Sequence, residues 1–135
     1  MSSKVYSQNY QATPMPGNPR YTEAWALTQA ARRMKEGQDA ADFPKSFLDA
    51  VRLNWRLWTI FQAEISSPDN PLPEDIRVNM LRLANFVDKT SVAIIAEPTP
   101  EKADVLININ REIAAGLFTD PETGQSQEGA SSETK

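Results

Sequence analysis

One segment, residues 44–65, limits the fold more than any other part of the chain. Its sequence, PKSFLDAVRLNWRLWTIFQAEI, repeats large apolar residues at intervals of three and four, the period of an α-helix. On a helical wheel these residues cover well over half of the circumference, and Arg52 and Arg56 lie in the narrow polar remainder. A helix with so wide an apolar arc needs neighbours on more than one side. We therefore predict a central helix with Trp55 and Trp58 in the core.

Three further helices are indicated by apolar spacing and by breakers at their ends. One covers about residues 20–36, with Gly37 as its stop. Another covers residues 73–96, and the last follows Thr99, a side-chain cap, and Pro100, and closes near Gly116. The predicted buried stripe of the first helix is Leu27, Ala30, Ala31 and Met34.

The predicted fold class is all-α, a small bundle of about four helices in a single domain over residues 20–118. Residues 1–19 contain several prolines and no sustained period, which indicates an extended arm. Residues 119–135 are acidic and contain no large apolar residue, so burial cannot repay the entropy of ordering them. We expect this tail to be disordered.

Composition argues against an enzyme. Of the 135 residues none is cysteine or histidine, which removes thiolate chemistry, the commonest metal ligand and the commonest general base. The adjacent carboxylates Glu74 and Asp75 point apart on a helix, and their place in its first turn explains them. We expect no catalytic residue, metal or cofactor. The N-terminus has no signal-type apolar run and no segment approaches a membrane span, so cytoplasmic residence is expected.

The charge distribution gives little support to direct nucleic-acid binding. The formal net charge is −4, with a mildly basic front half and an acidic remainder. Arg32, Arg33 and Lys35 form a short cluster, to which Arg52 and Arg56 could add. The simpler interpretation of the cluster is a solvated helix end whose cations suit the helix dipole.

Two asparagines lie where apolar residues are expected. Asn54 sits near the middle of the apolar arc of residues 44–65, and Asn110 lies at the centre of the arc of the last helix. An unpaired buried amide costs about 1 to 3 kcal/mol, so each needs a partner. We expect either a contact between the two amides or amide-to-backbone bonds that fix the packing; ligand binding is the alternative.

The third helix carries a second apolar strip. Val78, Leu81 and Val92 lie a quarter turn or more from its main stripe. The strip could pack on the first helix or the arm, or form an exposed groove for an amphipathic helix.

Three blocks of sequence resemble a known family. They are NWRLW (Asn54 to Trp58), NPLPEDIRVNMLRLANFV (Asn70 to Val87) and LININREIAAGL (Leu106 to Leu117). In this order and spacing they are similar to FlaF, the flagellar biosynthesis regulator of alphaproteobacteria, over roughly residues 4–118. That family often has an arginine directly after the asparagine; here Trp55 stands there and Arg56 follows.

The resemblance implies a non-enzymatic role in making flagellin, whose terminal segments form amphipathic helices in the filament and are poorly ordered in the monomer. The implied partner is flagellin, with the regulator FlbT as a possible companion; the alternative is post-transcriptional control of flagellin mRNA, directly or through FlbT. The proposed partner-binding residues are Tyr21, Trp25, Leu81 and Val92. Residues expected to act as buried polar or motif residues are Asn54, Arg56, Trp58, Asn110 and Arg111.

Overall fold

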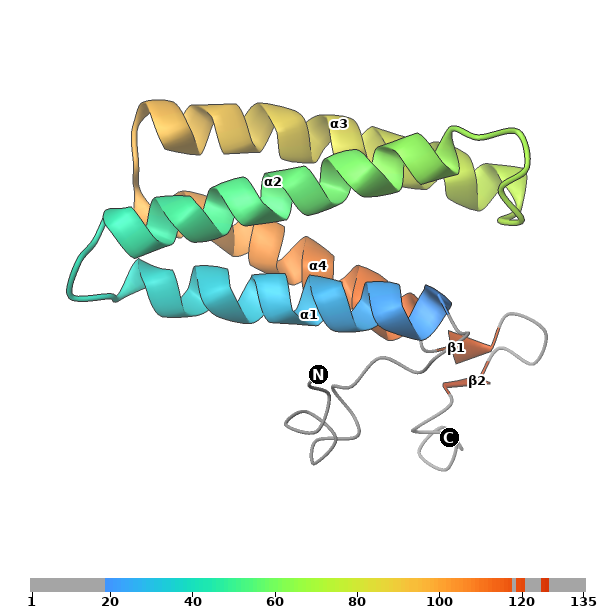
Figure 1. Cartoon of the computed structure of the whole chain (residues 1–135), viewed down its shortest axis with the longest axis horizontal. Helices are drawn as coiled ribbons and strands as arrows, with labels where there is room; N and C mark the ends of the chain where they lie inside the picture. The colour runs from blue at the N-terminus through green and yellow to red at the C-terminus, as the bar shows by residue number, and fades with distance from the viewer. Residues whose placement is uncertain (1–18, 118, 121–124, 127–135) are drawn as a thin grey trace, which may run out of the picture. The chain divides into compact units, whose positions relative to one another are not determined.

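In the computed structural model, whose helices are labelled in Figure 1, a proline stands at or just before the start of most helices. Proline is suited to a helix start because the donor that it lacks has no partner in the first turn. The elements are α1 (Pro19–Gln38), α2 (Lys45–Ile65), α3 (Glu74–Ala96), the 3-10 helix η3 (Pro100–Ala103), α4 (Asp104–Leu117), β1 (Thr119–Asp120) and β2 (Gln125–Ser126).

The structure describes residues 19–117, 119–120 and 125–126, and within them the all-α prediction is confirmed. The bounds of α2 and α3 differ from those expected by one residue, at the start of each. Strands β1 and β2 form a short antiparallel pair that composition did not indicate, with Thr119 opposite Ser126. Residues 1–18 of the predicted arm and most of the predicted tail lie outside the described residues.

The described chain divides into two compact units. The larger comprises Ala30–Asn108 and contains α2, α3 and η3 whole. The smaller contains residues 19–29 and 109–117 together with β1 and β2, so the division falls inside α1 and α4. One domain over residues 20–118 stays a prediction.

In the larger unit, α2 and α3 lie side by side and run in opposite directions (Figure 1). The Trp58 and Phe61 rings of α2 meet edge to face, with centroids 5.9 Å apart. The stripe that α2 buries is Phe47, Ala50, Val51, Asn54, Trp58, Phe61 and Ile65. The stripe that α3 buries is Met80, Ala84, Val87, Ser91 and Ile94.

The buried face of α2 is narrower than its apolar arc. Leu53 and Ile60 are exposed, and Trp55 is half-buried. The core prediction is therefore only partly met for Trp55, because the neighbours of α2 leave one apolar edge of the helix in solvent. The core prediction holds for Trp58, which is fully buried.

The loop between α2 and α3 is held by Asn70. Its Nδ2 donates to the carbonyl oxygen of Glu64 at 3.2 Å, and its Oδ1 accepts from the backbone N–H of Leu72 at 3.0 Å. The first bond satisfies one of the carbonyls that the last turn of a helix leaves without an internal partner. A single asparagine thus stabilises the end of α2 and the turn toward α3.

The end of α1 is tied to the rest of the larger unit through its last two residues. The sequence predicted that Gly37 ends the first helix. In the structure α1 continues through Gly37 and ends at Gln38. A Cβ placed on Gly37 would lie 2.7 Å from the Phe47 Cα, so this glycine permits a close approach of α1 and α2. The Gln38 Nε2 donates to the Pro100 carbonyl at 2.9 Å and to the Asp104 Oδ1 at 2.7 Å.

The predicted side-chain cap at Thr99 is not formed. Thr99 precedes η3 in an extended conformation, but its hydroxyl donates to the carbonyl of Glu97 at 3.4 Å. The turn is instead closed by the Lys102 N–H, which donates to the Thr99 carbonyl at 3.1 Å. The segment therefore begins as a 3-10 turn, and the α-helix starts at Asp104.

The predicted stripe of α1 is confirmed, with Leu27, Ala30, Ala31 and Met34 all buried. In the smaller unit, Ala24 and Leu27 of α1 and Asn110 and Ala114 of α4 are buried. Among the described residues, no helix combines the length and the apolar character needed to cross a membrane.

Gly37→Ala tests the close approach of α1 and α2. We expect it to lower the free energy of unfolding by about 1 to 2 kcal/mol, because the backbone of Phe47 must shift, even though alanine favours a helix over glycine by roughly 1 kcal/mol. Urea denaturation measures the change. Gly116→Ala is the matched control, since a Cβ there meets nothing within 4 Å. Equal stability of the two variants would contradict the packing role of Gly37.

Candidate partner-binding site

The apolar strip predicted on α3 is accessible. Val78 is 38 % exposed and Val92 is 52 % exposed, while Leu81 is half-buried. The three residues fall within about 60° of one another on the helix, away from the stripe that α3 buries. Of the two alternatives left by the sequence, the described residues favour an exposed strip over a packed one.

Trp55 of α2 borders this strip. Its indole Nε1 donates to the Asp88 Oδ1 of α3 at 2.8 Å, in a partly buried setting. Asp88 lies seven residues after Leu81 and four before Val92, so all three share one side of α3. The half-buried indole therefore stands beside the strip, where it adds apolar and aromatic surface.

The other two predicted partner-binding residues belong to the smaller unit. Trp25 is half-buried on α1, and Tyr21 lies in the first turns of the same helix, with its side chain outside the described part of the structure. Leu81 and Val92 belong to the larger unit. A joint surface of these four residues stays a prediction.

Three of the motif residues, Asn54, Trp58 and Asn110, are buried as predicted. Asn54 and Trp58 are fully buried in α2. Asn110 is fully buried in α4, and its Nδ2 donates to the Leu27 carbonyl of α1 at 3.1 Å. Of the arrangements expected for Asn110, the structure shows the amide-to-backbone bond, which links segments 83 residues apart. The neighbouring Arg111 is exposed.

Arg56 lines a cleft of about 610 Å³ between the end of α1 and the first half of α2. Sequence reasoning named its arginines but did not identify a cleft, because no local pattern indicates how two helices approach. The lining residues are Arg33, Glu36, Gly37, Ala40, Ser46, Asp49, Ala50, Arg52, Leu53 and Arg56.

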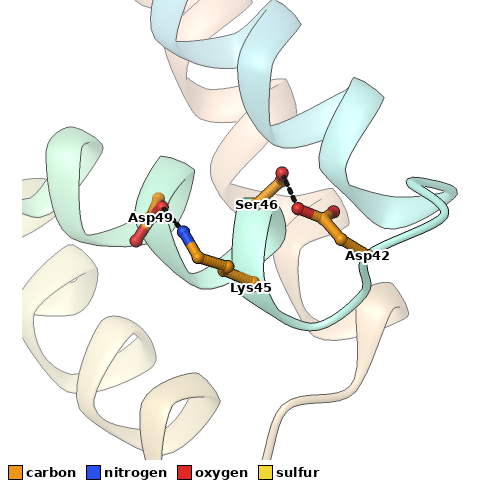
Figure 2. A network of polar contacts seen from close by, with 4 residues as sticks. All are labelled: Asp42, Lys45, Ser46 and Asp49. Atoms are coloured by element: carbon orange, nitrogen blue, oxygen red, sulfur yellow. Dashed lines mark hydrogen bonds and ion pairs between the residues drawn. The ribbon is translucent and has the colours of Figure 1, made fainter.

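A small polar network lies at the start of α2, at the edge of this cleft. The Ser46 hydroxyl donates to the Asp42 Oδ2 at 2.7 Å, and the Lys45 Nζ lies 3.5 Å from the Asp49 Oδ2; both contacts are drawn in Figure 2. Lys45 and Asp49 are mostly exposed and four residues apart, so this pair adds only a few tenths of a kcal/mol. Ser46 and Asp49, one member of each pair, line the cleft.

The three blocks that resemble FlaF now have places in the fold. The block NWRLW lies in α2, and the block that starts at Asn70 covers the loop after α2 and most of α3. The block LININREIAAGL lies in α4. The family model for the flagellar protein FlaF matches residues 3–117. The chain belongs to the FlaF family. No curated protein and no solved structure matches it.

Membership gives this FlaF protein a role related to the flagellum. The position after Asn54, often arginine in the family, is occupied by Trp55, which links α2 to α3 through Asp88. Arg56 is exposed in the cleft, so a basic side chain is still presented one position along the helix. Among the described residues of this FlaF chain, no group of three or more carboxylates is placed to hold a metal ion.

Asn110→Leu tests the buried amide of the third FlaF block. Leucine is similar in size but cannot donate to the Leu27 carbonyl, so we expect a loss of about 1 to 2 kcal/mol in the free energy of unfolding. The control is Asn108→Leu, at an exposed position of the same helix, which should change stability by less than roughly 0.5 kcal/mol. If both variants are as stable as the parent protein, the hydrogen bond from the Asn110 amide to the Leu27 carbonyl does not stabilise the fold.

Proposed function

We propose that this FlaF-family protein is a non-enzymatic chaperone or regulator that binds flagellin and so promotes its synthesis, stability or secretion. The single observation that carries the proposal is the exposed strip of Val78 and Val92 on α3, with Leu81 and Trp55 beside it. Apolar side chains that remain in solvent on a small helical unit are typical of a surface that a partner covers.

The strip suits a helical ligand. It extends from Val78 to Val92 on α3, roughly 21 Å, which is the length of about four turns of a partner helix. An amphipathic segment that laid its apolar face on Val78, Leu81 and Val92 would be held in the helix-in-groove mode. The amphipathic terminal segments implied for flagellin have this chemistry.

A second candidate function is control of flagellin mRNA, directly or through FlbT. The observation that bears on it is the gathering of Arg33, Arg52 and Arg56 in one cleft. Two carboxylates, those of Glu36 and Asp49, line the same cleft and oppose a phosphate backbone. The proposal is therefore that any effect on mRNA passes through a protein partner.

Isothermal titration with monomeric flagellin tests the leading proposal. We expect binding at micromolar concentration or tighter, a negative heat-capacity change from apolar burial, and loss of binding when flagellin lacks its terminal helices. Binding that survives this truncation would contradict the helix-in-groove mode. No binding at high concentration would contradict the proposed function.

The double variant Val78→Asp with Val92→Asp tests whether flagellin binds to the exposed strip on α3. Leu81 is less suited because it is half-buried, so an aspartate there would also be desolvated in the folded protein without a partner. We expect the double variant to lose flagellin binding by about 100-fold or more, since two carboxylates would have to be desolvated in the contact. Circular dichroism should show unchanged helical content.

The matched control for that variant is Phe86→Asp with Val105→Asp. These residues are 42 % and 40 % exposed and lie outside the strip, so the control introduces the same charge into the same kind of position. It should bind flagellin within about threefold of the parent protein. Equal loss in both double variants, or in neither, would reject the strip as the binding surface.

A further inference from the structure

The cleft between α1 and α2 is lined by three arginines, whose charge is only partly offset by the carboxylates of Glu36 and Asp49. Arg33 comes from α1, and Arg52 and Arg56 are one turn apart on α2; all three are exposed. None of these guanidinium groups forms an ion pair or hydrogen bond with a described residue. Each offers a planar set of donors that fits a carboxylate or a phosphate. These guanidinium groups can therefore bind a carboxylate or a phosphate of another molecule.

The remaining lining distinguishes between a peptide and a nucleic acid. Glu36 and Asp49 place negative charge among the arginines, and Asp49 is held by Lys45 at 3.5 Å (Figure 2). Each strand of a duplex carries a phosphate roughly every 3.4 Å along the helix axis. A backbone with charges this closely spaced would place phosphates near Glu36 and Asp49, which would repel them. A peptide can place its few carboxylates on the arginines and leave the acidic positions to neutral or basic side chains.

Apolar surface continues from the cleft along α2. Leu53 lines the cleft and is 40 % exposed; Ile60, two turns further, is 51 % exposed on the same side of the helix. Arg56 lies between them in sequence and is adjacent on the helix surface. An apolar edge bordered by guanidinium groups matches a helix whose apolar stripe is flanked by carboxylates.

We propose that this cleft and the Leu53–Ile60 edge form a second docking site, which binds an acidic amphipathic helix of a protein partner. The carboxylates of that helix pair with Arg33, Arg52 and Arg56, and its apolar stripe covers Leu53 and Ile60. The site differs from the α3 strip in the chemistry it selects, because the strip offers mainly apolar surface and the cleft adds three cations. It is therefore independent of the flagellin proposal.

The test uses three labelled probes in fluorescence anisotropy with the full chain. The first is a synthetic amphipathic helix of about 20 residues, with leucines at intervals of three and four flanked by glutamates. The second has lysines in place of those glutamates, and the third is a single-stranded RNA of similar length. We expect the glutamate peptide alone to bind, and its affinity to fall by about tenfold or more between about 50 mM and about 300 mM salt.

Two double variants locate the binding. Arg33→Gln with Arg56→Gln should weaken the glutamate peptide by about tenfold or more, because the removed charges pair with its carboxylates. Arg82→Gln with Lys89→Gln makes the same charge change at exposed positions of α3 and should leave the affinity within about twofold.

Several outcomes would overturn the proposal: no binding of the glutamate peptide, equal binding of the lysine peptide, equal effects of the two double variants, or tighter binding of the RNA. Flagellin titrated against Arg33→Gln with Arg56→Gln keeps the two proposals apart. Unchanged flagellin binding supports two separate sites. Loss of flagellin binding in that variant would place flagellin in the cleft and overturn the second site.

Discussion

Burial of a single stripe of α2 determines how the larger unit presents the rest of its surface. The stripe from Phe47 to Ile65 recurs at intervals of three and four, and its members are buried whether they are apolar or, as with Asn54, polar. Once that stripe faces inward, the helical period fixes where every other side chain of α2 points. Trp55 then reaches Asp88 on α3, whereas Leu53 and Arg56 remain on the outside.

Helix α3 has two apolar faces, of which only one is buried against the rest of the unit. Packing against the buried stripe of α2 places the stripe that includes Met80 and Val87 in the interior. The Trp55–Asp88 hydrogen bond adds a polar link between the two helices. The face that carries Val78 and Val92 has no described neighbour that covers it fully. The exposed side chains of this face contribute less to the stability of the unit than the buried stripe does, and the proposed function assigns the face to a partner.

Local periodicity was enough to predict the four helices, the buried stripe of α1 and the burial of Asn54, Trp58 and Asn110, because each depends on spacing along one helix. It could not predict how helices approach. Gly37 was interpreted as a stop because glycine commonly ends helices, but its reason is the backbone of Phe47, a residue on another helix. The sequence likewise placed Arg33 and Arg56 in a loose basic cluster but did not predict a cleft. The two residues line one cleft only because the end of α1 packs beside the first half of α2.

The size of the α3 strip limits the kind of complex that it can support. Standard stable interfaces bury about 1,200 to 2,000 Å² in total, more than three aliphatic side chains and the edge of an indole can provide. A helix that binds there must therefore contact α3 along most of its length, and affinity has to come from many modest contacts. Such a complex dissociates readily once another surface competes for the same apolar face. The proposed chaperone role, in which a filament subunit is held and then passed on, requires limited affinity of this kind, which a deep apolar pocket would not give.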